Sequence, residues 1–165
     1  MTKIKGLLLT EGMHGMISQV EGLAKALQLD FIHEKIELNN FWKFIPPKIT
    51  PVKSFVFKNV FHEKFEIVIS CGRKSVVPSI YLKSKYKNKI MSIHIQDPKV
   101  SLDNFDLVVA PEHDGLNGKN VLKTKGAIHY LRNDELNENI SYLKPQIKKE
   151  KIVTLIMGGP NKYYN

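Results

Sequence analysis

The stretch FDLVVAPEHDGLNGKN, residues 105–120, decides the fold expected for this chain of 165 residues. Its apolar run, Leu107 through Ala110, is typical of a strand buried on both faces, as in a parallel sheet. Pro111 then ends the strand, because its nitrogen cannot donate a sheet hydrogen bond. Polar side chains follow at once, and ligands of open α/β sheets bind at this carboxyl edge. The stretch therefore predicts a ligand site, with a solvated loop as the alternative.

Buried strands followed by polar or glycine-rich turns recur along the chain. Besides residues 107–110, apolar runs predict strands at residues 4–10, 29–38, 65–70, 89–95, 121–128 and 152–157. Helical spacing predicts helices over residues 20–27 and from Ser75 through Leu82, with Pro78 near the first turn of the second helix, and the polar stretch 134–149 is also expected to be helical. This alternation predicts an α/β fold, a Rossmann-like parallel sheet flanked by helices.

The chain stops soon after its last predicted strand. The run IVTLIM leads into Gly158 and Gly159, and such a strand normally feeds a helix that covers it. We therefore expect residues 1–150 to form an N-terminal Rossmann-like domain. Residues 151–165 are expected to begin a second, truncated domain of the same kind.

The composition restricts the classes of function. The formal net charge is +9, yet Arg73 and Arg132 are the only arginines among 25 basic residues. Proteins that read nucleic acid rely on arginine for bidentate contacts, and the lysines here are spread along the chain, so we expect no nucleic-acid partner. A compositional bias toward lysine and an attraction to anionic membranes or phosphorylated ligands are the two remaining explanations.

Neither a signal peptide nor a membrane-spanning helix is predicted, because no apolar run approaches the ~20 residues that a span requires. The single cysteine, Cys71, allows no intramolecular disulfide and is expected to be a small buried thiol in a reducing compartment. We expect a cytoplasmic protein, with peripheral contact at the inner face of the membrane as an option. The stretch that begins at Phe41 and ends at Phe61 combines aromatic residues with lysines, which suits a membrane interface. Packing of these aromatic residues beneath an irregular connection is the alternative.

Polar clusters after the first, third, fourth and fifth strands are expected to meet at one edge of the sheet. They contain Glu11, Gly12, His14 and Gly15; Gly72, Arg73, Lys74 and Ser75; Gln96 and Asp97; and Glu112, His113 and Asp114. Glycines and free amides at the starts of two helices favour an anionic ligand there, and the two cations after the third strand would bind a phosphate. No recognised metal-ligand spacing is present, so neither a metal nor a cofactor is predicted. His33 is expected at the surface and His94 in the core.

Four segments, in their order and spacing, resemble one protein family. The segments are GMHGMISQVEGLAKAL, SCGRKSVVPSIYLK, IQDPKVSLDNFDLVVAPEHD and GLNGKNVLKTKGAIH. They are similar to the mitochondrial fission family first described in plants, whose bacterial members are often labelled nucleoside-diphosphate-sugar epimerases. That family resembles the two-domain GT-B glycosyltransferases, so this chain is expected to be the N-terminal, acceptor-side half. IMGGPNK resembles the start of the C-terminal half.

The resemblance implies transfer of a sugar from a nucleotide-sugar donor to a phosphorylated, envelope or lipid-linked acceptor, with this half inactive alone. Such a transfer needs a base for the acceptor hydroxyl and cations for the leaving diphosphate. His14 is the first candidate base, with Glu112 and Asp114 as rivals. The ligand-binding candidates are Gly12, Gly15, Gly72, Arg73, Lys74, Ser75, Gln96, Asp97, His113 and Asn120.

Two other functions stay open. One is a non-catalytic, membrane-associated adaptor, as the fission role of the plant relatives implies. The other is a nicotinamide-dependent epimerase, for which Tyr81 and Lys85 have the Tyr-x-x-x-Lys spacing. The epimerase is the weaker of the two, because the first loop lacks the dinucleotide-binding glycine pattern.

Overall fold

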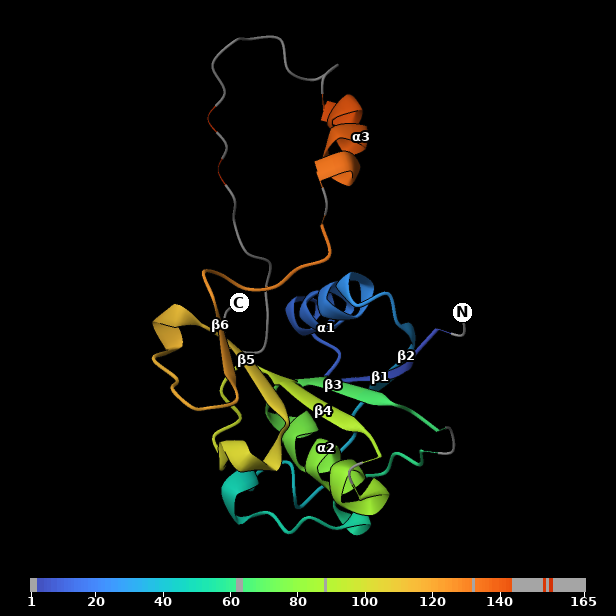
Figure 1. Cartoon of the computed structure of the whole chain (residues 1–165), viewed down its shortest axis with the longest axis vertical. Helices are drawn as coiled ribbons and strands as arrows, with labels where there is room; N and C mark the ends of the chain where they lie inside the picture. The colour runs from blue at the N-terminus through green and yellow to red at the C-terminus, as the bar shows by residue number, and fades with distance from the viewer. Residues whose placement is uncertain are drawn as a thin grey trace. The chain divides into compact units, whose positions relative to one another are not determined.

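The computed structural model describes residues 3–61, 64–87, 89–131, 133–143, 153 and 155. Contacts divide the chain into two compact units, Met1–Tyr130 and Leu131–Asn165. The first unit contains the sheet (Figure 1), and α3 (Asn133–Leu143) is the described element of the second. The remainder of the helix predicted over 134–149 lies outside the described residues. So do the strand predicted over 152–157 and the second domain predicted over 151–165, apart from residues 153 and 155.

One parallel sheet of six strands, in the order β2-β1-β3-β4-β5-β6, forms the centre of the first unit. Its elements are β1 (Lys5–Thr10), α1 (His14–Ala26), β2 (Asp30–Lys35), β3 (Ile67–Cys71), α2 (Arg73–Tyr86), β4 (Met91–Ile95), β5 (Leu107–Pro111) and β6 (Val121–Thr124). The chain steps outward from β1 to β2 and then crosses to β3 on the other side of β1. This reversal makes a topological switch point between β1 and β3. The predicted Rossmann-like α/β fold is confirmed.

The two long helices cover opposite faces of the sheet, as Figure 1 shows. Successive residues of β1 point to opposite faces. Leu8 lies in the core cluster that contains Val20 of α1, whereas Leu7 and Leu9 lie in the cluster that contains Val77 of α2. Burial on both faces is the reason why the strands read as unbroken apolar runs in the sequence.

Several predicted boundaries differ from the structure. The strands predicted over 29–38 and 121–128 are shorter, at Asp30–Lys35 and Val121–Thr124. Pro78 was expected near the first turn of its helix. It is the sixth residue of α2 and therefore lies beyond that turn. Among the described residues, the connections that follow β4 and β5 contain only the short 3-10 helices η3 (Leu102–Asn104) and η4 (Glu112–Asp114).

The long connection between β2 and β3 folds against the α2 side of the sheet. It includes the 3-10 helices η1 (Pro47–Ile49) and η2 (Ser54–Val56) and a bridge between Leu38 and Phe57. Val56 and Phe57 are buried in the same core cluster as Val77, whereas Phe41, Phe44 and Phe55 are exposed. Packing beneath the connection is therefore confirmed for Val56 and Phe57, whereas membrane contact through the exposed rings stays a prediction. Among the helices that the structure describes, none is long and apolar enough to cross a bilayer.

Candidate functional site

Glu11 follows β1 at the switch point, and its carboxylate contacts the start of α2. Oε1 accepts a hydrogen bond from the backbone N–H of Lys74 at 3.0 Å, and Oε2 lies 3.0 Å from Lys74 Nζ. Burial raises the pKa of Glu11, but the two hydrogen bonds from Lys74, its charge and that of Arg73 together outweigh this effect and lower the pKa. The amide and the ammonium group of Lys74, which were predicted to bind a ligand phosphate, are therefore engaged by a carboxylate of the protein itself.

The other predicted residues at the start of α2 also bond within the fold. Gly72 has a φ of 91°, and a Cβ there would lie 2.6 Å from Met16 Sδ. This position accordingly requires glycine. Arg73 Nη2 donates to the carbonyl oxygen of Lys43 at 2.7 Å, and the buried Ser75 Oγ donates to the carbonyl oxygen of Gly72 at 2.8 Å. These contacts fix the connection and the first turn of α2.

In the turn after β1, only one of the two glycines, Gly12, has a backbone conformation that favours glycine. Gly12 has a φ of 85°, and its N–H donates to Thr10 Oγ1 at 3.0 Å. Gly15 lies within the first turn of α1, with nothing within 4 Å of a Cβ added there, so the structure does not require glycine at this position. His14 is the exposed first residue of α1.

A pocket of about 450 Å³ lies at the carboxyl ends of β4 and β5, and we call it the edge pocket. Its lining consists of Gln19, Gln96, Asp97, Lys99, Pro111, His113, Asp114 and Ala127. The structure thus brings together four of the predicted site residues, which come from two neighbouring strand ends. Glu112 is exposed in η4, and neither it nor His14 belongs to this lining.

The turn after β4 has an unusual backbone. Gln96 has a φ of 82° and Lys99 a φ of 57°, although both carry side chains. The Gln96 N–H donates to the carbonyl oxygen of Val109 at 2.8 Å, which holds the turn against β5. Non-glycine residues with such angles concentrate at functional sites, so the turn favours a binding role for this pocket.

Asp97 and Lys99 form an ion pair at the pocket wall. Asp97 Oδ1 accepts a hydrogen bond from the Lys99 N–H at 2.8 Å, and Oδ2 lies 2.6 Å from Lys99 Nζ. Partial burial raises the pKa of Asp97, but the hydrogen bonds from Lys99 outweigh it, so the pKa is lowered. The side-chain hydrogen bond to Asp97 in turn raises the pKa of Lys99. Both groups are therefore charged at neutral pH.

His113 and Asp114 form the second charged pair of the edge pocket. His113 Nε2 lies 3.6 Å from Asp114 Oδ1, and the imidazole is 74% exposed against 32% for the carboxylate. The two side chains are next to each other in η4, and the carboxylate lies near the ring without a hydrogen bond between them. This pair has the composition of a general base with its supporting acid.

Two histidines lie behind the carboxyl edge. Burial lowers the pKa of His94 to about 3 despite the charge of Asp97, and Nδ1 lies 2.9 Å from Ser70 Oγ. The expectation of a core histidine at His94 is confirmed. His33 was expected at the surface, and this was wrong: it is half-buried, with Nε2 2.8 Å from Thr10 Oγ1, and burial lowers its pKa although Glu21 and Glu34 act in the opposite direction.

Cys71 is fully buried at the end of β3. Burial, and to a lesser degree the charge of Glu11, raise its pKa to about 12. The thiol therefore stays protonated and cannot act as a nucleophile at neutral pH. The expectation of a small buried thiol is confirmed.

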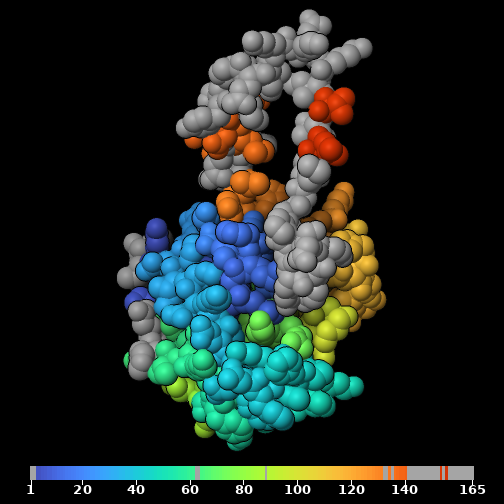
Figure 2. Space-filling model, turned by 180° about the vertical axis from the view of Figure 1, so that it is seen from behind, coloured from blue at the N-terminus to red at the C-terminus, as the bar shows by residue number. Residues whose placement is uncertain are grey.

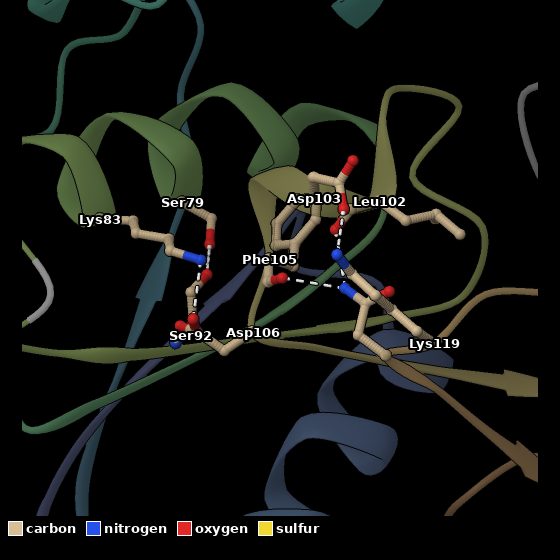
Figure 3. Close-up of polar contacts among 9 residues, drawn as sticks. Ser79, Lys83, Ser92, Leu102, Asp103, Phe105, Asp106 and Lys119 are labelled. Carbon is tan, nitrogen blue, oxygen red and sulfur yellow. Dashed lines mark hydrogen bonds and ion pairs between the residues drawn. The ribbon is translucent and has the colours of Figure 1, made fainter.

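Asn120, a predicted ligand-binding residue, uses its side chain within the fold. Nδ2 donates to the carbonyl oxygens of Leu102 and Phe105, both at 2.9 Å. Figure 3 shows Leu102 and Phe105 together with the ion pair of Lys83 and Asp106, in which Nζ and Oδ1 lie 2.8 Å apart. Lys83 joins the connection before β5 to α2, whereas Asn120, the residue that precedes β6, is tied to that connection.

Two lining residues were not predicted. Gln19 comes from the body of α1, where no motif marks it, and only the packing of α1 on the sheet brings it to the pocket. Lys99 was detectable in principle, because Asp97 before Pro98 is typical of a turn in which the carboxylate accepts an N–H two residues later. Among the described residues, no group of three or more His, Cys, Asp or Glu side chains suits a metal ion.

A doubly wound parallel sheet with polar side chains gathered at its carboxyl edge defines a Rossmann-like ligand-binding domain. Residues 14–165 match the family model described as Mitochondrial fission ELM1, and the chain belongs to this family. The resemblance carried by the four sequence segments is thereby confirmed. A search of curated proteins and a search of solved structures each found no match.

Proposed function

We propose that this domain is the acceptor-binding half of a GT-B-type glycosyltransferase, which transfers a sugar from a nucleotide-sugar donor to an envelope or lipid-linked acceptor. Membership of a family with GT-B-like architecture and the parallel six-stranded sheet support the proposal. The observation that carries it is the edge pocket, in which carboxylates, amides and an imidazole meet. This function would place the protein in the cytoplasm, at the inner face of the membrane.

The chemistry of the edge pocket suits a ligand rich in hydroxyl groups. Gln19 and Gln96 each offer both donors and acceptors, and Asp97 and Asp114 are acceptors for hydroxyl protons. Lys99 Nζ is already paired with Asp97 Oδ2 at 2.6 Å, so the lining residues that the structure describes present no unpaired lysine to a phosphate. We therefore assign the pocket to the sugar or alcohol part of the acceptor.

His113 is the base in this proposal, and Asp114 supports it. The acceptor hydroxyl gives its proton to the free ring nitrogen of His113 while its oxygen bonds to the anomeric carbon of the donor sugar. The bond from that carbon to the nucleoside diphosphate breaks, and the diphosphate leaves with the electron pair. Asp114, 3.6 Å from Nε2, stabilises the imidazolium that results. Of the three bases that the sequence predicts, His14 and Glu112 lie outside the pocket lining, whereas Asp114 belongs to it.

The test uses the full-length protein made from its natural gene, with radiolabelled UDP- and GDP-sugars and a lipid extract as acceptor. Label transferred to the lipid phase is the readout. His113→Gln should reduce the rate by about 10²- to 10⁴-fold, the contribution typical of a general base. Glu112→Gln removes a neighbouring exposed carboxylate and should leave the rate unchanged. Absence of transfer from all donors, or equal rates in both variants, would overturn the proposal.

A second candidate is the non-catalytic membrane adaptor, which the exposed Phe41, Phe44 and Phe55 favour. It predicts membrane binding without turnover in the same assay. The epimerase alternative gains no support. Tyr81 packs against the core, with its ring centroid 5.4 Å from that of Phe57. Lys85 is in the last turn of α2, at the end of the helix opposite to the carboxyl edge of the sheet.

A further inference from the structure

The connection between β2 and β3 exposes large aromatic side chains on one part of the surface. Phe44 is 82% exposed, Phe41 67% and Phe55 58%. The apolar side chains of Ile49 and Val60, each 69% exposed, belong to the same connection. Figure 2 shows this connection, coloured cyan and teal, gathered at the lower part of the view. We call residues 41–60 the aromatic–lysine face.

Three aromatic side chains of this face contact one another, and two hydrogen bonds anchor the backbone beside them. The rings of Phe41 and Trp42 pack edge to face, with their centroids 5.0 Å apart. The centroids of the Trp42 and Phe55 rings are 5.9 Å apart. Asn39 Nδ2 donates to the carbonyl oxygen of Phe55, and Arg73 Nη2 donates to the carbonyl oxygen of Lys43 at 2.7 Å. A fixed cluster of this kind loses little conformational entropy when it binds a surface.

The charge of the face is positive throughout. Four lysines and no acidic residue occur between Phe41 and Phe61. Lys58 is paired with a carboxylate, since its Nζ lies 3.7 Å from Glu37 Oε2. Within the described parts of the chain, the other three, Lys43, Lys48 and Lys53, have no carboxylate partner. An anionic surface would therefore meet lysines whose charge is not yet compensated.

A second pocket, of about 420 Å³, opens beside this face. Its lining combines the apolar side chains of Val52, Val77 and Ile80 with Lys48, and none of the described lining residues is acidic. Lys99 also lines it, but its ammonium group is already paired with Asp97. An apolar wall beside the unpaired Lys48 suits a molecule that has both hydrocarbon and phosphate, such as a single phospholipid at a membrane surface.

We propose that the aromatic–lysine face docks on an anionic phospholipid bilayer, with Phe41, Phe44 and Phe55 at the level of the headgroups and the lysines on lipid phosphates. Aromatic rings favour this interface, and lysines beside them are attracted to its negative potential. The Arg73 contact ties the face to the start of α2, so docking brings the carboxyl edge of the sheet close to the membrane. The inference goes beyond the proposed function and holds whether or not a sugar is transferred.

Sedimentation with vesicles tests the charge contribution. The full-length protein should bind phosphatidylcholine vesicles that contain phosphatidylglycerol and bind pure phosphatidylcholine far more weakly. Raising the salt from about 0.1 M to about 1 M should weaken binding, because the Debye length falls from about 10 Å to about 3 Å. Replacing Lys43, Lys48 and Lys53 together by glutamine should lower the partition coefficient by about 100-fold, about fivefold for each lysine.

The matched control replaces Lys3, Lys64 and Lys89 by glutamine, which changes the net charge equally. These exposed lysines precede β1, β3 and β4 and so lie at the opposite edge of the sheet. The control should bind anionic vesicles within about twofold of the unmodified protein. Equal losses in the two triple variants would show that only the net charge matters and would overturn the docking face.

Trp42, the only tryptophan, reports insertion directly. Brominated lipids should quench its fluorescence when the protein binds, and Phe44→Ser should weaken binding about tenfold by removing one inserted ring. Binding to vesicles without quenching of Trp42, or unchanged binding by Phe44→Ser, would overturn the proposal. Failure to bind anionic vesicles at all would also overturn the proposal, and a protein partner would then be the alternative occupant of the face. The transfer assay is unaffected by these outcomes if a water-soluble acceptor is used.

Discussion

Replacement of Glu11 tests how the switch point of the sheet is held together. Its carboxylate accepts the Lys74 N–H at 3.0 Å and lies 3.0 Å from Lys74 Nζ, and the Glu11 side chain is only 15% exposed. Glu11→Ala removes one charged hydrogen bond to a helix amide, which contributes about 1.5–3 kcal/mol. The partial exposure of Lys74, at 31%, reduces the value of the ion pair. We expect the free energy of unfolding to fall by about 2 kcal/mol.

The pH dependence of the same variant series has a definite sign. The folded state lowers the pKa of Glu11, so the stability that its charge contributes is present above the unfolded pKa of about 4.3. This contribution is lost as the pH falls through the folded pKa, because the folded carboxylate then binds a proton as well. The difference in unfolding free energy between the unmodified protein and Glu11→Gln should therefore be constant near neutral pH and shrink under acid conditions.

Urea unfolding followed by Trp42 fluorescence measures both effects, because Trp42 packs against the core of the first unit. Glu112→Gln is the matched control, since it removes an exposed carboxylate from η4 and should change stability by less than about 0.5 kcal/mol. The reasoning is refuted if Glu11→Ala is as stable as the control. It is also refuted if the difference between unmodified protein and Glu11→Gln persists unchanged at acid pH.

Four further outcomes follow from the same structure. Gly72→Ala should reduce the unfolding free energy in urea by about 1–3 kcal/mol, because of the φ of 91° and a Cβ 2.6 Å from Met16 Sδ. Gly15→Ala should be neutral or stabilising by up to about 1 kcal/mol, since nothing lies within 4 Å of the new Cβ; equal effects of the two variants would contradict this. Burial lowers the pKa of His94 to about 3 in the folded protein, so as the pH falls His94 takes up a proton in the unfolded chain before it does so in the folded one. The free energy of unfolding should therefore fall by about 1.4 kcal/mol per pH unit below about pH 6.5. His94→Gln should flatten that slope in urea titrations, and an unchanged slope would argue against the assignment. Cys71, whose pKa burial raises to about 12, should react with a disulfide reagent only as the protein unfolds in urea, and fast labelling of the native protein would contradict its burial.

The sheet was predictable because its strands are buried on both faces. Leu7, Leu8 and Leu9 face two different core clusters yet form one apolar run, which is the pattern that predicts a parallel strand. Parallel strands also share one carboxyl edge, so residues after β4 and β5 could be placed together from sequence. The edge pocket contains Asp97 and Asp114 for that reason.

The contacts that sequence could not provide are long-range pairs of polar side chains. Glu11 and Lys74 are 63 positions apart, and nothing local indicates that one engages the other. The same holds for Asn120, whose amide bonds to carbonyl groups of the turn before β5 instead of a ligand. The aromatic stretch was divided by packing: Phe57 fills the core while Phe44 remains exposed, a distinction that composition does not contain.

The most direct test of the central claim is a chemical-shift map of the backbone amides by NMR, with a panel of monosaccharides and sugar phosphates as probes. The account predicts shifts at Gln19, Gln96, Asp97, His113 and Asp114, which are polar residues of the edge-pocket lining. Shifts confined to the start of α2, at Gly72 and Ser75, would contradict it, because they would place the ligand where Glu11 now holds the helix. The absence of shifts with every probe would equally contradict it.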